Sequence, residues 1–243
     1  MLINYIPLAK AMPEVSKRDG KQYVCSLGYD QTLGFIRVYP TPLDGIDLWT
    51  PIQFKAERNK RDSRAASWKM PEDCRHGEWS VNKKMVSYGQ RISSSAQLTL
   101  LKKMMQKTVS SISELNEKRE SIGFLIVPNF RIVPEENPLF INTTQFGMFE
   151  DVEIADFTRF TKHSRETMFR VRFEDEDGQH NLQFNRWDIW ETARKFGASK
   201  AVDLFSNPGP HLLMLGNYLQ HQTSWSVLGI WSVPVQLDLF NES

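Results

Sequence analysis

The chain has 243 residues, and its 30 lysines and arginines nearly balance its 29 aspartates and glutamates, which leaves a formal net charge of +1. Hydrophobic residues make up 40%, charged residues 24% and aromatic residues 12%, a composition that excludes collagen-like, coiled-coil and intrinsically disordered chains. No apolar run approaches the roughly 18 residues that span a bilayer. Residues 1–10 lack the pattern of a signal peptide, so we expect a cytoplasmic protein with no membrane partner.

In chain order, the first half predicts strands, a basic stretch and then helices. Strand-forming residues occupy Gln22–Gly28, Gly34–Tyr39 and Leu48–Ala56. From Ser93 to Lys107 the pattern changes, because apolar side chains recur at helical spacing with lysines between them. The apolar positions are Leu98, Leu101, Met104 and Met105. They predict an amphipathic helix, which is followed by a shorter helix that starts at Ser113.

In the second half, strand signals resume and are broken by prolines. The predicted strands are Ile122–Val127, Phe130–Val133, a pair within Glu150–Phe160, Thr167–Phe173, Gln179–Phe184, Leu212–Leu215 and Trp225–Val233. Thr167–Phe173 and Gln179–Phe184 flank an acidic turn and predict a hairpin, and Asn185–Phe196 predicts a helix. Short strands at this spacing with few helices are typical of β-barrels, one in each half of the chain.

The charges are divided unevenly between the two halves. Residues 1–120 hold 20 basic and 13 acidic residues, a net of +7, whereas residues 121–243 hold 10 and 16, a net of −6. The near-neutral total is therefore a cancellation, and a basic face is expected on the N-terminal half. The densest basic stretch runs from Lys55 to Lys69, and the acidic residues gather at Glu174–Asp177.

The basic stretch contains the aromatic residue Trp68, and an earlier predicted strand carries Arg37 and Tyr39; grooves that bind single-stranded nucleic acid combine cations for phosphates with aromatic rings that stack on bases. The candidate nucleic-acid-binding residues are Arg37, Tyr39, Lys55, Arg58, Lys60, Arg61, Arg64 and Trp68. The alternative is that the basic stretch is a solvent-exposed loop, as most charged segments are.

The C-terminal pentapeptide resembles the motif with which bacterial polymerases and mismatch-repair proteins bind the DNA sliding clamp. The candidate partner-binding residues are Gln236, Leu237, Asp238, Leu239 and Phe240. Pro234 prevents a helix from continuing into this segment, and Leu239 and Phe240 are costly to expose unless a pocket receives them. The alternative is a final edge strand with Leu237 and Leu239 on one face.

Catalytic and metal-binding patterns are weak. Two cysteines form neither a disulfide framework nor a zinc site alone, and the histidines lack metal-ligand spacing. No phosphate-binding Gly-Lys-Ser/Thr motif is present. We therefore expect no catalytic residue, metal or cofactor, although a nuclease site could use the scattered carboxylates Asp62, Asp188 and Glu191.

Several strings together resemble a family of bacterial and mobile-element proteins described as dual OB-fold domain proteins. They are Gly34–Pro40, Asp62–Arg64 with Ser67, Glu120–Gly123, Phe169–Phe173 continuing to Trp187-Asp188, and Leu215-Gly216 with Trp225–Trp231. The sequence departs from the family pattern at Trp187-Asp188-Ile189, where an acid-aromatic-acid run is expected. The resemblance implies two five-stranded OB barrels, a fold that often binds oligonucleotides.

These observations predict a mainly β protein with a few helices (α+β), made of two OB-like β-barrels with an inserted amphipathic helix. The expected domains are residues 1–125 with the basic loop and helix, residues 126–233, and a tail at 234–243. The leading interpretation is a non-enzymatic nucleic-acid-associated protein, with DNA as the expected ligand, recruited to the sliding clamp by its tail. The alternatives are a clamp-tethered nuclease or defence effector, and an adaptor or inhibitor that only occupies the clamp groove.

Overall fold

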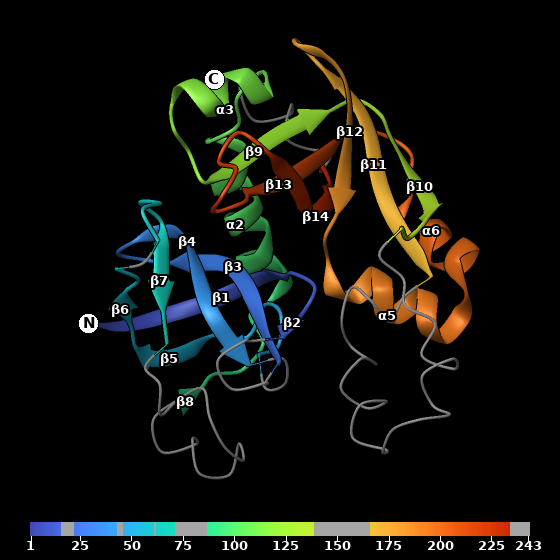
Figure 1. Ribbon diagram of the computed structural model, residues 1–243. Coiled ribbons are helices and arrows are strands. Elements are labelled where there is room, and N and C mark those ends of the chain that lie inside the picture. Colours follow the sequence, from blue (N-terminus) through green and yellow to red (C-terminus); the bar gives the residue numbers. More distant parts are fainter. Residues whose placement is uncertain (16–21, 43–45, 61, 71–86, 139–165, 234–243) are drawn as a thin grey trace.

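The computed structural model describes residues 1–15, 22–42, 46–60, 62–70, 87–138 and 166–233, which form two β-sheets and four helices (Figure 1). Among these helices, none is both long and apolar enough to cross a membrane. The mainly β fold with two barrel-like units is confirmed.

The first sheet contains eight strands and closes on itself. Its strands are β1 (Leu2–Lys10), β2 (Glu14–Val15), β3 (Gln22–Asp30), β4 (Gly34–Pro42), β5 (Ile52–Lys55), β6 (Glu57–Arg58), β7 (Ser67–Lys69) and β8 (Ser87–Tyr88). Strand β5 pairs with β1, and β6 pairs with β7 at the other end of the sheet. Only Ala56 separates β5 from β6, and its backbone exchanges two hydrogen bonds with Met1, each of 2.7 Å. One bent strand therefore joins the two ends of the sheet.

The second sheet has six strands, and again two strands that are consecutive in the chain lie at its two ends and close it. Its strands are β9 (Ile122–Val127), β10 (Phe130–Glu136), β11 (Thr167–Asp175), β12 (Gly178–Phe184), β13 (His211–Asn217) and β14 (Trp225–Ser232). Strands β9 and β10 follow each other across Pro128, yet β9 pairs with β13 and β10 pairs with β11. Each barrel also contains one parallel pair, β4 with β7 and β12 with β14, so the two share the same strand order.

Four helices accompany the sheets. They are α2 (Ser94–Met105), α3 (Ile112–Glu117), α5 (Trp187–Phe196) and α6 (Ala198–Phe205). The side chains of Ser93 and Ser111 cap the N-termini of α2 and α3 by accepting backbone hydrogen bonds. The predicted helices before the second barrel and after β12 are confirmed, whereas α6 was not predicted.

Three apolar clusters hold the molecule together. One fills the first barrel around Tyr5 and Phe54, and another fills the second barrel around Phe169 and Phe184. The third cluster includes Met104 of the amphipathic helix α2, and Figure 1 shows where this helix runs relative to the two sheets. It joins side chains from both barrels, namely Leu8, Leu27, Trp49, Ile122, Phe124, Leu212, Met214 and Leu228. The barrels and α2 are therefore packed as one body.

The expected domain boundary at residues 125 and 126 falls inside β9, which belongs to the second sheet, so we propose to place it before Ile122. Strand β1 was missed by the sequence analysis, although its first residues alternate between exposed and buried positions. The strand pair expected within residues 150–160 lies outside the described residues.

Candidate nucleic-acid interface

A cavity of about 1140 Å³ lies between the two barrels. The first barrel contributes Ala11, Met12, Cys25, Arg37, Tyr39, Pro40, Glu57, Arg58, Asn59, Lys60, Asp62, Arg64 and Lys69. The second barrel contributes Asn185, Gly216, Asn217, Tyr218, Leu219, Gln220, His221, Ser226 and Leu228. Most of the lining comes from β3, β4 and the β6–β7 hairpin of one barrel, and from the β13–β14 hairpin of the other.

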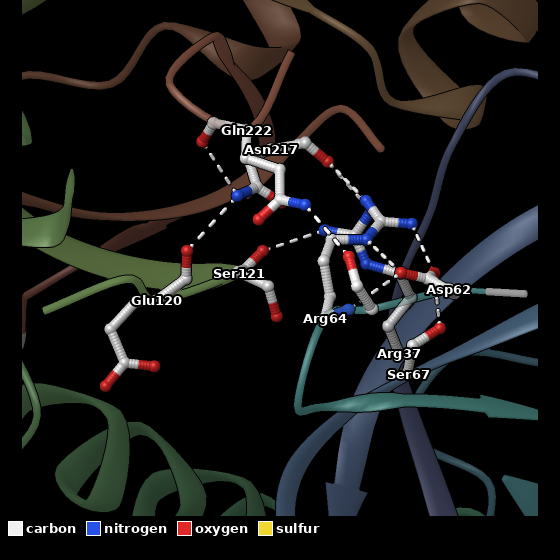
Figure 2. A network of polar contacts seen from close by, with 9 residues as sticks. Arg37, Asp62, Arg64, Ser67, Glu120, Ser121, Asn217 and Gln222 are labelled. Carbon is white, nitrogen blue, oxygen red and sulfur yellow. Dashed lines mark hydrogen bonds and ion pairs between the residues drawn. The ribbon is translucent and has the colours of Figure 1, made fainter. Parts of the chain in front are cut away.

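Arg37 crosses from the first barrel to the second at the base of this cavity. Its side chain leaves β4 and donates hydrogen bonds of 2.8 Å to the carbonyl oxygens of Asn217 and Ser121 (Figure 2). Burial lowers the pKa of this guanidinium, which is only 5% exposed. A Cβ at Gly216 would lie 3.1 Å from Arg37 Nη2 and 2.5 Å from Leu228, so the glycine leaves room for this contact.

Arg64 reinforces the contact from the β6–β7 loop. Its Nη1 donates to the Asn217 carbonyl at 2.7 Å, while its Nε and Nη2 bind the two carboxylate oxygens of Asp62 at 2.8 and 2.6 Å (Figure 2). Burial opposes ionisation of Asp62, but the hydrogen bonds from Arg64 and Ser67 outweigh it and lower its pKa to about 2. The Asp62 carboxylate is therefore ionised at neutral pH, and its partner is a residue of the protein, Arg64.

The remaining cations lie along the exposed wall of the first barrel. The Arg58 guanidinium lies 5.2 Å from the centre of the Trp68 ring and donates to the carbonyl of Ala65. Lys69 pairs with Glu57 at 2.9 Å, and Lys60 is exposed. The lining includes five lysines and arginines against two carboxylates, so the cavity carries an excess of positive charge.

The opposite wall is the β13–β14 loop. It presents Tyr218 and Leu219 at 37% and 43% exposure, and the Tyr218 hydroxyl donates to Gln183 Oε1 at 3.1 Å. Gln222 of the same loop donates to Ser63 Oγ at 3.1 Å, so this loop touches the β6–β7 loop of the first barrel. The two loops that line the cavity are thus held against each other.

Five of the eight candidate nucleic-acid residues line this cavity: Arg37, Tyr39, Arg58, Lys60 and Arg64. Lys55 is exposed on β5 and does not line it, and half-buried Trp68 packs on the core of the first barrel beneath Arg58. Arg61 and the tail motif Gln236–Phe240 lie outside the described residues.

The sequence analysis missed the whole contribution of the second barrel, as well as Lys69. One signal for the β13–β14 loop was available: Tyr218 and Leu219 are large apolar residues that follow directly on a fully buried strand, β13. Nothing in the sequence places this loop opposite the basic stretch, because their approach depends on how the barrels pack.

The carboxylates considered for a nuclease are engaged elsewhere. Asp62 pairs with Arg64, Asp188 pairs with Arg186 at 2.6 Å, and Glu191 pairs with Arg194 at 3.0 Å. Within the described ranges, the metal-ligand types that cluster are Asp175, Asp177 and His180, at the acidic turn. Their carboxylates accept hydrogen bonds from the backbone of α3, so these groups serve to cap a helix.

Part of the chain matches one family model. Residues 4–107 match a family model described as "Domain of unknown function (DUF8758)". The match covers the first barrel and α2. No curated protein matches the chain. A murine DNA-binding protein solved with double-stranded DNA is similar at 8% identity over 96% of this chain and 98% of its own, and the TM-score of 0.35 is too low to indicate a shared fold.

Proposed function

We propose that this protein binds nucleic acid in the cavity between its barrels. The observation that carries the proposal is the lining: cations of the β6–β7 region and the tyrosines Tyr39 and Tyr218 surround one opening of about 1140 Å³. Lysine and arginine neutralise phosphates, and aromatic rings stack on bases. Because Arg37 and Arg64 are buried and donate to carbonyl groups of the second barrel, the phosphate contacts in this proposal are assigned to the exposed residues Arg58 and Lys60.

The position of the cavity supports the same proposal. In OB folds the second and third strands and the loops after the first and fourth strands bind oligonucleotides. If the barrels are OB barrels, β3 and β4 are the second and third strands of the first one, and the β6–β7 loop follows its fourth. The cavity lies on these elements.

The test measures the affinity of the purified protein for a fluorescently labelled 20-nucleotide DNA. Fluorescence anisotropy reports the binding at several salt concentrations. We expect salt-sensitive binding that weakens by roughly tenfold or more in Arg58→Glu/Lys60→Glu. The control is Lys195→Glu/Lys200→Glu, an equal charge change at exposed positions on α5 and α6. Equal weakening in both variants, or no binding by the wild type, would overturn the proposal.

We further propose that the tail at residues 236–240 recruits the protein to a bacterial sliding clamp. Attachment to the clamp would raise the effective concentration of the protein at DNA, so a modest cationic surface would suffice. The motif itself supports this, since Leu239 and Phe240 are adjacent large apolar residues that follow Gln236 and Leu237 at the spacing of the clamp-binding motif.

This second proposal is tested by titrating a purified bacterial clamp with the full-length protein. We expect Leu239→Ala/Phe240→Ala to weaken binding by more than roughly tenfold, as for residues that fill a pocket at an interface. The control substitution Glu242→Ala, just beyond the motif, should leave the affinity unchanged. If the apolar double variant binds like the wild type, or if the wild type fails to bind, recruitment by this tail is excluded.

A further inference from the structure

The two walls of the cavity carry different chemistry. All of its lysines, arginines and carboxylates come from the first barrel. Among the described residues that line it, the second barrel contributes amides, Tyr218, Leu219, His221, small polar groups and no lysine, arginine, aspartate or glutamate. One wall is therefore cationic, and the wall facing it is neutral.

We propose that the ligand is a single-stranded polynucleotide that lies with its sugar-phosphate backbone toward the cationic wall and its bases toward the β13–β14 loop. This inference rests on the proposed function and adds the class of nucleic acid and its orientation. A single strand has exactly these two sides, because phosphates run along one edge and unpaired bases project from the other.

The cationic wall suits a phosphate backbone because two exposed cations lie close together along the chain. Arg58 and Lys60 are two residues apart at the end of β6 and are both exposed. The carboxylates of this wall are already neutralised, Glu57 by Lys69 at 2.9 Å and Asp62 by Arg64 at 2.6 Å. A phosphate that approaches Arg58 and Lys60 therefore meets no uncompensated negative charge among the lining residues.

The neutral wall suits bases because its apolar groups are exposed and its aromatic side chain is held by a hydrogen bond. Tyr218 is held by its hydrogen bond to Gln183, which leaves the ring on the surface at 37% exposure beside Leu219. An aromatic ring that is already positioned stacks on a base with little further loss of conformational freedom. Gln220 adds an amide that both donates and accepts, as base edges do.

Double-stranded DNA does not match this arrangement. A duplex carries phosphates on both strands and keeps the faces of its bases stacked inside. It would place one backbone against a wall without cations and would offer no base face to Tyr218. Single-stranded DNA should therefore bind more tightly than a duplex of the same length.

The experiment compares two double variants of the full-length chain by salt dependence and by ligand. Arg58→Ala/Lys60→Ala should reduce the slope of log affinity against log salt concentration by about 0.7 for each lost phosphate contact. Tyr218→Ala/Leu219→Ala should leave that slope unchanged and weaken binding to single-stranded DNA by roughly tenfold. Its matched control is Phe196→Ala/Leu204→Ala, which removes two exposed apolar side chains from α5 and α6.

An oligonucleotide of abasic sites isolates the bases. The wild type should bind it roughly tenfold more weakly than normal single-stranded DNA, whereas Tyr218→Ala/Leu219→Ala should bind both alike, and Tyr218→Phe should restore the discrimination. If duplex DNA binds as tightly as a single strand, or if Tyr218→Ala/Leu219→Ala still discriminates, the orientation is wrong while nucleic-acid binding stands. If the wild type shows no salt-sensitive binding to nucleic acid, the proposed function itself is wrong.

Discussion

At the scale of residues, the most consequential feature is a buried ion pair that stabilises the contact between the two barrels. Asp62 is only 5% exposed and is paired with Arg64, which is 8% exposed. A buried pair of this kind is costly to desolvate, and the cost is offset only where further hydrogen bonds saturate both partners. Here Ser67 and the Asn217 carbonyl supply them, so the pair fixes the β6–β7 loop against the second barrel.

The ion pair predicts a pH dependence of stability. The pKa of Asp62 is lowered to about 2 by Arg64 and Ser67 despite burial, against about 3.9 in an unfolded chain. A lowered carboxyl pKa contributes stability that is complete above roughly pH 5 and is lost as pH falls toward 2. The free energy of unfolding, measured with urea, should therefore fall by about 2 kcal/mol more in the wild type than in Asp62→Asn between pH 6 and pH 2.

The comparison concerns the change with pH, because Asp62→Asn also leaves a buried arginine unpaired and is less stable at pH 6. Asp203→Asn, which replaces an exposed carboxylate on α6, serves as the control and should follow the wild type. Identical pH profiles for the wild type and Asp62→Asn would show that this pair does not govern acid stability.

At the scale of elements, the sequence predicted what depends on local pattern. The amphipathic helix α2 and the β11–β12 hairpin follow from the spacing of apolar residues within a dozen positions. Strand β1 and helix α6 were missed. In β1, residues 7–9 are buried in succession, so its alternation stops halfway along the strand. In α6, Ala198, Ala201, Val202 and Phe205 do form an apolar face at helical spacing against the core of the second barrel, but the helix has only eight residues and starts directly after Gly197.

The acidic turn shows why a charge pattern alone could not be interpreted. The sequence predicted an acidic turn between two strands, and in the structure Asp175 Oδ2 accepts from the backbone nitrogen of Ile112 at 3.0 Å and Asp177 Oδ2 from that of Ser113 at 2.8 Å. These bonds satisfy the free N–H groups at the start of α3. They join positions more than 60 residues apart, which local pattern does not reveal.

At the scale of the whole molecule, the basic and the acidic half of the chain form opposite walls of the cavity. The cations that line the cavity all come from the basic half, and the wall that faces them comes from the acidic half without contributing any of its carboxylates. The sequence therefore predicted the cationic wall of the cavity. It could not predict the neutral wall, because the position of the β13–β14 loop depends on how the two barrels pack. That packing rests on the interbarrel apolar cluster and on Arg37.

Arg37 should accordingly stabilise both barrels at once. Arg37→Ala would remove the two hydrogen bonds from a charged donor that link β4 to the second barrel and open a void at the interface, at a cost of several kcal/mol, since each hydrogen bond from a charged group contributes about 1.5–3 kcal/mol. Because the barrels share an apolar cluster, hydrogen exchange measured by mass spectrometry should accelerate together in β4 and in β13. Arg172→Ala, which removes an exposed arginine paired with Glu135, should leave both protected. Faster exchange in β4 alone would show that the barrels open independently and that the cavity between them is not a fixed feature of the fold.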